Sequence, residues 1–432
     1  MVDVTVTKSE RVGGEVDAPP SKAYTHRALI ASLLSEGISI VSNPLDCDDT
    51  EATLAAIKAL GANVKQEKNR WTVKGLGKIE TPKVTINCQE SGATMRFMIP
   101  VAALAPGVST FTIGQSLGRR PLEPLLQSLK QLGVRSDFQQ NEKTSIVRVH
   151  GGGIKGGEIW IRGDISSQFI SGLLFACPKA EKDVVIHVNT PLESKSYVQM
   201  TMEVLRKHSI KVHAEDNLTR FRIPSNQKYE THHHDIPGDF SSAAFLLAAA
   251  AVTSSKVKVK NLDSHTLQGD KAILDILKQM GINMVTRDKY VEITGGQLKA
   301  VTVEARDIPD LVPVCAALAC YSQGTYKVHN AKRLRYKESD RLSSLQVELK
   351  KMGAKIKIDG ESLVVEGTCP MRGTVIDSHN DHRIAMACAV VALGADGETT
   401  IQSSECVKKS YPKFFEDLHS LGANVVGWQL DR

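Results

Sequence analysis

The chain alternates between amphipathic segments and short runs of β-branched residues, and one helix-to-strand pattern returns six times. In each copy, an amphipathic segment ends at a small residue and a strand-like run follows. These small residues are 72, 76, 72, 72 and 69 positions apart, and six units of 72 residues equal the 432 residues of the chain. They are Gly61, Gly133, Ser209, Gly281, Gly353 and Gly422. A residue just past a helix end often adopts a left-handed conformation, which glycine tolerates best, so Ser209 is expected to be the weaker cap.

A second kind of segment precedes each amphipathic one and is apolar almost all round, which predicts a helix buried on every side. The six copies begin with SKAYTHRALIASLL, SGATMRFMIPVAAL, SSQFISGLLFAC, FSSAAFLLAAAA, IPDLVPVCAALAC and NDHRIAMACAVVAL. Short β-branched runs such as KVTINC and STFTIG lie between the helices and indicate strands. Each unit therefore predicts the order strand–helix–strand–helix–strand–strand, and the fold class is α/β.

The two ends of the chain predict how the repeats are grouped. The sixth unit stops at ANVVGWQLDR, one strand short, while VDVTVT stands before the VGGEVD run that we assign to the first unit. We therefore expect the N-terminal strand to complete the last unit. The predicted domains are residues 1–18 plus 238–432 and residues 19–237, with three repeats in each. The chain then crosses between them near Asp17–Pro20 and near Ile236–Gly238.

Composition narrows the class of protein. Apolar residues make up 41% and charged residues 24%, the balance of a soluble globular protein, and no apolar stretch approaches the length of a membrane span. The N-terminus lacks the layout of a signal peptide, and the eight cysteines are scattered singly. These features indicate small core thiols in a reducing compartment and favour a cytoplasmic protein.

Charge and histidine content exclude two further classes of site. The net charge of +6 is spread along the chain and only 5% of residues are aromatic, so a nucleic-acid surface is not expected. His232, His233 and His234 are adjacent, and neighbours on a strand point to opposite faces. We therefore expect a partly exposed strand near the crossing there, without a metal site.

Cations stand in the first turns of several of the buried helices. Lys22 lies where the helix dipole disfavours a positive charge, and Arg27 and Arg96 lie inside otherwise apolar helices. Further clusters, GRRP, RLRYKESDR and NDHR, stand at equivalent ends of the repeat. Because helix N-termini and buried cations both attract anions, this pattern predicts a polyanionic ligand.

With these segments assembled, the chain resembles the enolpyruvyl transferase family, and within it the 5-enolpyruvylshikimate-3-phosphate synthases, also called 3-phosphoshikimate 1-carboxyvinyltransferases. The resemblance covers essentially the whole chain. It is carried by SKAYTHRA, GATMRF, RRP, SSQF, ESKSY, GDFSSAAF, IPD, KESDR, NDHR and VKKSYP, in the order and spacing of that family.

The resemblance implies a two-domain inside-out α/β barrel, with six βαβαββ repeats arranged three per domain around pseudo-threefold axes. It implies transfer of the enolpyruvyl group of phosphoenolpyruvate to the 5-hydroxyl of shikimate 3-phosphate, by addition and elimination. This step belongs to the shikimate pathway, which leads to chorismate and the aromatic amino acids. The resemblance further implies no cofactor and no metal, two small-molecule substrates, no nucleic-acid or membrane partner, and a monomer.

The family's site residues map onto positions of this sequence. The implied catalytic residues are Asp310, which takes the hydroxyl proton, Glu338, which protonates the methylene carbon, and Lys22, which lies near the transferring oxygen. The residues implied to bind shikimate 3-phosphate are Lys22, Arg27, Ser166, Ser167, Gln168, Ser194, Tyr197, Asp310 and Lys337. Those implied to bind phosphoenolpyruvate are Lys22, Gly92, Arg120, Gln168, Arg341, His382, Arg383 and Lys409.

Two departures from the family pattern stand out. Ala23 occupies the position of a serine expected to contact shikimate 3-phosphate, so one hydroxyl contact is lost or is supplied by another residue. The family's N-A-G-T before the second buried helix is Glu90-Ser91-Gly92-Ala93 here, which keeps the glycine and changes its neighbours.

Two alternative functions are weighed against this one. The sister enzyme that transfers enolpyruvyl to UDP-N-acetylglucosamine carries a cysteine in the loop before its R-P dipeptide, where this chain has Gly114–Arg120 without one. An RNA-end-processing or RNA-binding protein with related repeats would lack the combination of Lys22, Asp310, Glu338 and Lys409. Both comparisons favour the shikimate enzyme.

Overall fold

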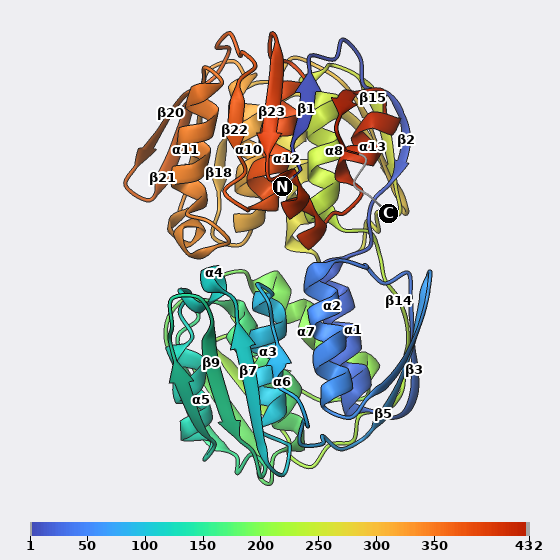
Figure 1. Cartoon of the computed structure of the whole chain (residues 1–432), viewed down its shortest axis with the longest axis vertical. Coiled ribbons are helices and arrows are strands. Elements are labelled where there is room, and N and C mark those ends of the chain that lie inside the picture. Colours follow the sequence, from blue (N-terminus) through green and yellow to red (C-terminus); the bar gives the residue numbers. More distant parts are fainter. Residues whose placement is uncertain (1, 429–432) are drawn as a thin grey trace. The chain divides into compact units, whose positions relative to one another are not determined.

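The computed structural model describes residues 2–428 and divides the chain into two compact units (Figure 1). The terminal unit consists of Met1–Pro19 and Pro237–Arg432, and the middle unit of Pro20–Ile236. The chain passes between the units at Pro19–Pro20 and at Ile236–Pro237, each beside a proline whose fixed φ restricts the backbone. That each unit is a domain stays a prediction.

Each unit contains three sheets of four strands within the described residues, and all six sheets share one pattern. The first two strands are parallel, and the third and fourth each run antiparallel to their neighbour. In the middle unit the sheet orders are β14-β3-β5-β4, β6-β7-β9-β8 and β10-β11-β13-β12. In the terminal unit they are β2-β15-β17-β16, β18-β19-β21-β20 and β22-β23-β1-β24. The repeat that the sequence predicts is therefore confirmed.

The strands are short and most have one buried and one exposed face. In the middle unit they are β3 (Glu36–Ser42), β4 (Asn63–Glu67), β5 (Arg70–Leu76), β6 (Ile86–Asn87), β7 (Val108–Ile113), β8 (Arg135–Gln139), β9 (Ser145–His150), β10 (Gly157–Ile161), β11 (Val184–Val188), β12 (His213–Ala214), β13 (Arg220–Ile223) and β14 (His233–Asp235). In the terminal unit they are β1 (Val4–Thr7), β2 (Gly14–Asp17), β15 (Lys256–Lys260), β16 (Asn283–Arg287), β17 (Tyr290–Thr294), β18 (Thr302–Glu304), β19 (Thr325–His329), β20 (Lys355–Asp359), β21 (Ser362–Glu366), β22 (Val375–Asp377), β23 (Glu398–Gln402) and β24 (Asn424–Val426).

The N-terminal strand completes the last repeat, as predicted. β1 lies between β23 and β24 and is antiparallel to both, with Val4 opposite Ile401 and Val6 opposite Val425. The assignment of VGGEVD to the first repeat is wrong. β2 instead pairs in parallel with β15 of the fourth repeat, and β14 supplies the parallel strand of the first repeat by pairing with β3. The two crossings explain this exchange, because each unit takes its missing first strand from the segment that precedes a crossing.

The helices predicted to be buried all round form the interior of each unit. In the middle unit they are α1 (Lys22–Leu34), α3 (Gly92–Ala102) and α6 (Ser167–Ala176), and in the terminal unit α8 (Phe240–Val252), α10 (Val312–Cys320) and α12 (His382–Ala392). α3 packs against α1 and α6, and α8, α10 and α12 pack against one another. Most of their residues are buried, because the sheets and the amphipathic helices cover them. Interior helices and outer sheets are the arrangement expected of an inside-out barrel.

The amphipathic helices are α2 (Asp48–Ala59), α5 (Glu123–Gln131), α7 (Lys195–Lys207), α9 (Ile273–Gln279), α11 (Arg341–Lys351) and α13 (Phe414–Ser420). The remaining helical segments are α4 (Gln115–Gly118), η1 (Cys177–Lys179), η2 (Gly269–Ala272), η3 (Pro309–Leu311), η4 (Lys332–Tyr336) and η5 (Ser404–Lys409). The residue past each amphipathic helix is left-handed, as predicted. The φ angles include 112° at Gly61 and 63° at Ser209, where a side chain is held in a conformation that glycine adopts more easily.

His233 and His234 lie in β14, an edge strand beside the crossing, and His232 directly precedes that strand. His233 is exposed, and His234 is buried with its Nε2 2.8 Å from Nε2 of His208. All eight cysteines are free thiols, and seven of them are buried. Among residues 2–428, the helices are too short or too polar to cross a membrane.

Candidate functional site

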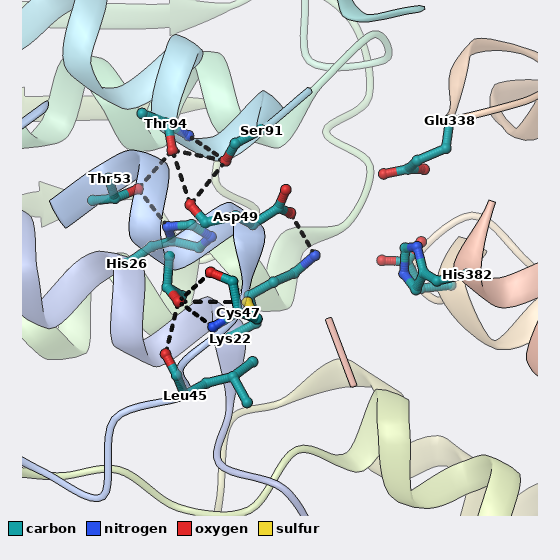
Figure 2. A network of polar contacts seen from close by, with 12 residues as sticks. Lys22, His26, Leu45, Cys47, Asp49, Thr53, Ser91, Thr94, Glu338 and His382 are labelled. Carbon is teal, nitrogen blue, oxygen red and sulfur yellow. Dashed lines mark hydrogen bonds and ion pairs between the residues drawn. The ribbon is translucent and has the colours of Figure 1, made fainter. Parts of the chain in front are cut away.

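The N-terminal ends of α1, α2 and α3 in the middle unit are joined by a polar network (Figure 2). Nζ of Lys22 forms an ion pair with Oδ2 of Asp49 at 2.7 Å. The hydroxyls of Ser91 and Thr94 both donate to the carbonyl oxygen of Asp49 at 3.3 Å. Thr94 Oγ1 lies 2.6 Å from Oγ1 of Thr53. Asp49 thus offsets the unfavourable position of the Lys22 cation at the start of a helix, and the hydroxyls fix Asp49.

His26 extends this network inside α1. Its Nδ1 lies 2.7 Å from Oγ1 of Thr53, so α1 is tied to α2 one turn above the Lys22–Asp49 pair (Figure 2). Only 1% of His26 is exposed. The network therefore holds the first turn of α1, including Lys22, in a fixed position.

Arg27 is a buried cation that is held by uncharged groups. Its guanidinium donates to Oγ1 of Thr201 and to the carbonyl oxygens of Ala23 and Tyr197 at 2.8–2.9 Å. Its Cζ also lies 5.8 Å from the ring centre of Tyr197. Burial lowers the pKa of Arg27 to about 10, and within residues 2–428 no carboxylate pairs with it. Two of its five N–H groups remain for an anion.

Gly92, Arg96 and Gln168 meet where α3 and α6 begin. Arg96 donates from Nη1 to Oε1 of Gln168 at 2.7 Å. A Cβ atom at Gly92 would lie 3.0 Å from Arg96 Nη1, so the glycine leaves room for this pair. Ser166 is the N-cap of α6 and accepts from the backbone N–H of Gln168. Ser167 is the first residue of the same helix and is buried.

Arg120 and Ser194 occupy ordered turns of the middle unit. Arg120 is buried just after α4 and donates to Oγ of Ser116 at 3.4 Å. Glu90, one of the departures from the family pattern, accepts from the backbone N–H groups of Ser116 and Leu117 and so caps α4. Ser194 is buried and left-handed, with a φ of 56°, at the start of α7.

Four predicted site residues of the terminal unit form one charged cluster. Asp310, in η3, accepts from Nη1 of Arg341 at 2.8 Å and from Nζ of Lys337 at 3.2 Å. Glu338 accepts from Nη2 of Arg341 at 2.6 Å. The turn KESDR places Lys337 and Glu338 directly before α11, and Arg341 is the first residue of that helix.

The cluster fixes the ionisation of Asp310. Burial raises the pKa of Asp310, but the cations of Arg383, Lys337 and Arg341 outweigh it and hold that pKa well below its ordinary value. Burial lowers the pKa of Lys337, while Asp310 opposes this shift. Asp310 is therefore a carboxylate at neutral pH, and its oxygens are acceptors only.

Arg383 and His382 start α12 beside Asp381. Arg383 donates from Nη1 to the carbonyl oxygen of Asp310 at 3.1 Å, and its Nη2 lies 3.6 Å from Oδ2 of Asp310. His382 is buried, with Nδ1 3.8 Å from Oδ1 of Asp381. Lys409, the last predicted residue, is buried at the end of η5, a segment that packs on α12.

The sequence prediction missed three carboxylates: Asp49 of the middle unit, and Asp270 and Asp381 of the terminal unit. Asp49 pairs with Lys22, and Asp381 accepts from Nε of Arg341 at 2.8 Å. Asp270 accepts from the hydroxyl of Ser241, and burial together with the charge of Asp310 raises the pKa of Asp270. Asp49 stands in the first turn of α2 and Asp381 is the N-cap of α12, where an aspartate is ordinary and gives no signal of function. Asp270 lies in a short 3-10 turn with no such signal.

Comparisons with known proteins agree along the whole chain. The family described as EPSP synthase (3-phosphoshikimate 1-carboxyvinyltransferase) matches residues 6–418. A 3-phosphoshikimate 1-carboxyvinyltransferase of Methanosarcina acetivorans is 45% identical over 430 residues, covering 98% of each chain. One of Methanocaldococcus jannaschii is 40% identical over 424 residues, covering 97% of this chain and 98% of the relative.

The fold agrees as well. A solved structure of EPSP synthase from Acinetobacter baumannii superposes with a TM-score of 0.83 at 25% identity, covering 98% of this chain and 99% of the other. The fold therefore indicates the same family as the sequence match and the named relatives. The chain belongs to the EPSP synthase (3-phosphoshikimate 1-carboxyvinyltransferase) family.

Proposed function

We propose that this chain transfers the enolpyruvyl group of phosphoenolpyruvate to the 5-hydroxyl of shikimate 3-phosphate, releasing phosphate. It is a transferase of the shikimate pathway. The observation that carries its chemistry is the placement of the Asp310 carboxylate against Lys337, Arg341 and Arg383 in a chain of this family. Both substrates carry a phosphate and a carboxylate, so buried cations are the groups expected to hold them.

Shikimate 3-phosphate is assigned mainly to the middle unit. Arg27 is proposed to take its carboxylate, because the guanidinium is desolvated, lacks a carboxylate partner within residues 2–428 and has two N–H groups to spare. Ser166 and Ser167, at the start of α6, are proposed to hold its phosphate, where the helix dipole favours an anion. Gln168, Ser194, Tyr197, Asp310 and Lys337 complete the proposed set.

Phosphoenolpyruvate is assigned to a second set of residues, most of them cations. The proposed contacts are Lys22, Gly92, Arg120, Gln168, Arg341, His382, Arg383 and Lys409. At Gly92 the missing side chain exposes the first backbone N–H groups of α3, which suit a phosphate. Lys22 is proposed to lie near the transferring oxygen, with its orientation set by Asp49.

The proposed reaction proceeds by addition and elimination. The 5-hydroxyl oxygen bonds to C2 of phosphoenolpyruvate and gives its proton to Asp310, while Glu338, after taking up a proton from solvent, protonates C3 to form a methyl group. In the elimination the C2–O bond to phosphate breaks, Glu338 takes a proton back from the methyl group, and Asp310 returns its proton to the departing phosphate. Lys22 and the arginines stabilise the negative charge that moves through these steps.

The low proton affinity of Asp310 in this structure also has a place in the proposal. A carboxylate that accepts from Arg341 and Lys337 is a weak base. The carboxylate and phosphate of phosphoenolpyruvate compete with Asp310 for Arg341 and Arg383, and losing part of that pairing raises the pKa of Asp310. Asp310 would therefore become an effective base only when phosphoenolpyruvate is bound.

We further propose that the enzyme is a cytoplasmic monomer that needs neither cofactor nor metal. Eight free thiols support a reducing compartment. Cell fractionation tests the compartment, and light scattering tests the oligomeric state.

The function is tested by measuring phosphate release from phosphoenolpyruvate with three acceptors: shikimate 3-phosphate, UDP-N-acetylglucosamine and none. We expect phosphate release when shikimate 3-phosphate is the acceptor, and none with the other acceptor or without an acceptor. Release with the nucleotide sugar instead would assign the chain to the sister activity, and no release with either acceptor would refute enolpyruvyl transfer.

A further inference from the structure

α11 presents two buried charged side chains to the segment between β22 and α12. Arg341 and Glu348 stand two helical turns apart and therefore lie on one face of the helix. Arg341 is 1% exposed and Glu348 is fully buried. A buried carboxylate is costly unless charged and hydrogen-bonded partners satisfy it, so the contacts of Glu348 decide its role.

Those contacts hold one short stretch of backbone. Oε1 of Glu348 accepts from Nε2 of His379 at 2.9 Å, and Oε2 accepts from the backbone N–H of Asp377 at 3.1 Å. Lys351, one turn on, donates to both oxygens at 2.7 and 3.0 Å. Glu348 thus binds the end of β22 and the residue two positions further on, while Lys351 balances its charge.

The stretch that Glu348 holds is strained. His379 and Asn380 are both left-handed, each with a φ of 53°, a conformation that side chains other than glycine adopt at a cost of about 1 kcal/mol or more. Internal hydrogen bonds support the turn, including His379 N–H to Oδ1 of Asp377 at 2.7 Å. The His379–Glu348 bond is one of its attachments to the neighbouring helix.

The strained turn places Asp381, which is 0% exposed. Asp381 accepts from Nε of Arg341 at 2.8 Å and from the backbone N–H of Arg383 at 3.0 Å. Arg341 and Arg383 both contact Asp310, as Lys337 does. α11 therefore holds the segment at two points: Arg341 binds Asp381, and Glu348 binds His379 just before it.

We propose that Glu348 is a positioning residue for the phosphoenolpyruvate side of the reaction, acting through His379 and the turn 378–381 on Asp381, Arg341 and Arg383. This inference rests on the proposed function. Glu348 touches no substrate in this account. Its effect is the alignment of two arginines whose N–H groups must meet a carboxylate or phosphate in a fixed geometry.

The charges around the pair give it a pH dependence. The hydrogen bond to Glu348 raises the pKa of His379, and the charge of Asp377 in β22 raises it further. Burial and the charge of Lys351 in α11 lower it, but the net shift is upward. Burial raises the pKa of Glu348, but the bonds from His379 and Lys351 outweigh it and the net shift is downward. From α12, the buried Cys388 faces Glu348 and stays a neutral thiol, because burial raises its pKa.

The sign follows from these directions. A histidine whose folded pKa is raised stabilises the turn fully below its ordinary value of about 6.5, and that contribution is lost as the pH rises through the raised pKa. We therefore expect the KM for phosphoenolpyruvate in the wild-type enzyme to increase at alkaline pH, with little change in shikimate 3-phosphate binding.

The test compares Glu348→Gln, His379→Asn and a control, Glu158→Gln, by steady-state kinetics across pH. Glu158 forms an exposed pair with His187 at 2.8 Å, so the control removes the same kind of contact elsewhere. Glu348→Gln should lower kcat/KM for phosphoenolpyruvate by about 10- to 100-fold and leave the Kd of shikimate 3-phosphate within about twofold. His379→Asn tolerates the left-handed backbone but removes the bond to Glu348, so it should lower the same constant to a similar extent and lose the alkaline rise in KM.

Three results would overturn the proposal: wild-type constants and pH profile in Glu348→Gln, equal losses for both substrates, or an alkaline rise that persists in His379→Asn. If Glu348→Gln does not fold, the His379→Asn profile decides alone. A histidine NMR titration keeps the test independent of the activity. The pKa of His379 should fall in Glu348→Gln, and an unchanged pKa refutes the inference even if the wild type proves inactive.

Discussion

Arg341 donates from Nη1 to Asp310 at 2.8 Å and from Nη2 to Glu338 at 2.6 Å, so a single guanidinium contacts both carboxylates proposed to move protons. Its Nε is held by Asp381. This arrangement fixes both carboxylates to the N-terminus of α11, each on a different nitrogen of Arg341. It also means that a substrate anion binding Arg341 changes the environment of both.

Asp310→Asn removes the proposed base and keeps the side-chain volume. Turnover should fall by about 10²–10⁴-fold, the range for loss of a positioned acid or base, because an amide oxygen does not take the hydroxyl proton. The Kd of shikimate 3-phosphate, measured by calorimetry, should stay within a few-fold of wild type. Near wild-type turnover would remove Asp310 from the role of base.

Glu338→Gln removes the acid that is proposed to protonate C3 of phosphoenolpyruvate. A similar loss of about 10²–10⁴-fold in turnover is expected, since C3 then has no proton donor at that position. Rapid-quench kinetics with both substrates provide the measurement. A variant that turns over like the wild type would show that another group protonates C3.

Arg27→Met removes the cation proposed to bind the carboxylate of shikimate 3-phosphate. Charge-assisted hydrogen bonds contribute about 1.5–3 kcal/mol, so the Kd of shikimate 3-phosphate should rise about 10- to 150-fold. Calorimetry on Arg222→Gln, which removes an exposed arginine of the same unit, is the control and should match wild type. A Kd that is unchanged in Arg27→Met would place the carboxylate elsewhere.

Arg341→Met leaves Asp310, Glu338 and Asp381 without their shared partner. Removing one member of a buried ionic group costs about 3–5 kcal/mol, and urea denaturation should show a loss of that size. Arg335→Met is the matched control, because Arg335 pairs with Asp340 at 2.8 Å in a partly exposed position and should cost less than about 1 kcal/mol. Equal losses in the two variants would contradict the buried-cluster account.

The buried pair His208 and His234 predicts an acid-labile middle unit. Burial lowers the pKa of His208 to about 4 and that of His234 further. Both stay neutral when folded, while the unfolded chain protonates them near pH 6.5, so the free energy of unfolding should fall as the pH drops from 6.5 towards 4. The slope is at most about 1.4 kcal/mol per pH unit for each histidine. Urea denaturation should show a shallower slope in His208→Gln, and an unchanged slope would show that other groups dominate.

Much of the fold could be predicted because short sequence patterns define the helices, caps and strands of each repeat. Left-handed caps at Gly61 and its equivalents, and helices such as Phe240–Val252 that are apolar all round, need no tertiary information. The partner of Gly14–Asp17 could not be predicted. Its sequence suits either the first or the fourth repeat, and only the path of the chain at Pro19–Pro20 decides between them.

The site was predictable where the chemistry conflicts with local structure. Lys22 at a helix start and Arg27 in an apolar helix are anomalies that a sequence reveals. Asp270 and Glu348 show no such conflict in the sequence. Asp270 lies in a short 3-10 turn, and the neighbours of Glu348 in α11 are those expected around an exposed helix residue. Their importance comes from burial against Ser241 and His379, which are contacts between distant segments.

The most direct test of the account is to run the reaction with phosphoenolpyruvate and shikimate 3-phosphate in D₂O and examine the product by NMR. Addition followed by elimination passes through a methyl group that receives one solvent hydrogen. The account therefore predicts 5-enolpyruvylshikimate 3-phosphate with deuterium in its vinyl methylene group, and far slower labelling in Glu338→Gln. Product without deuterium, or no enolpyruvyl product at all, would contradict it.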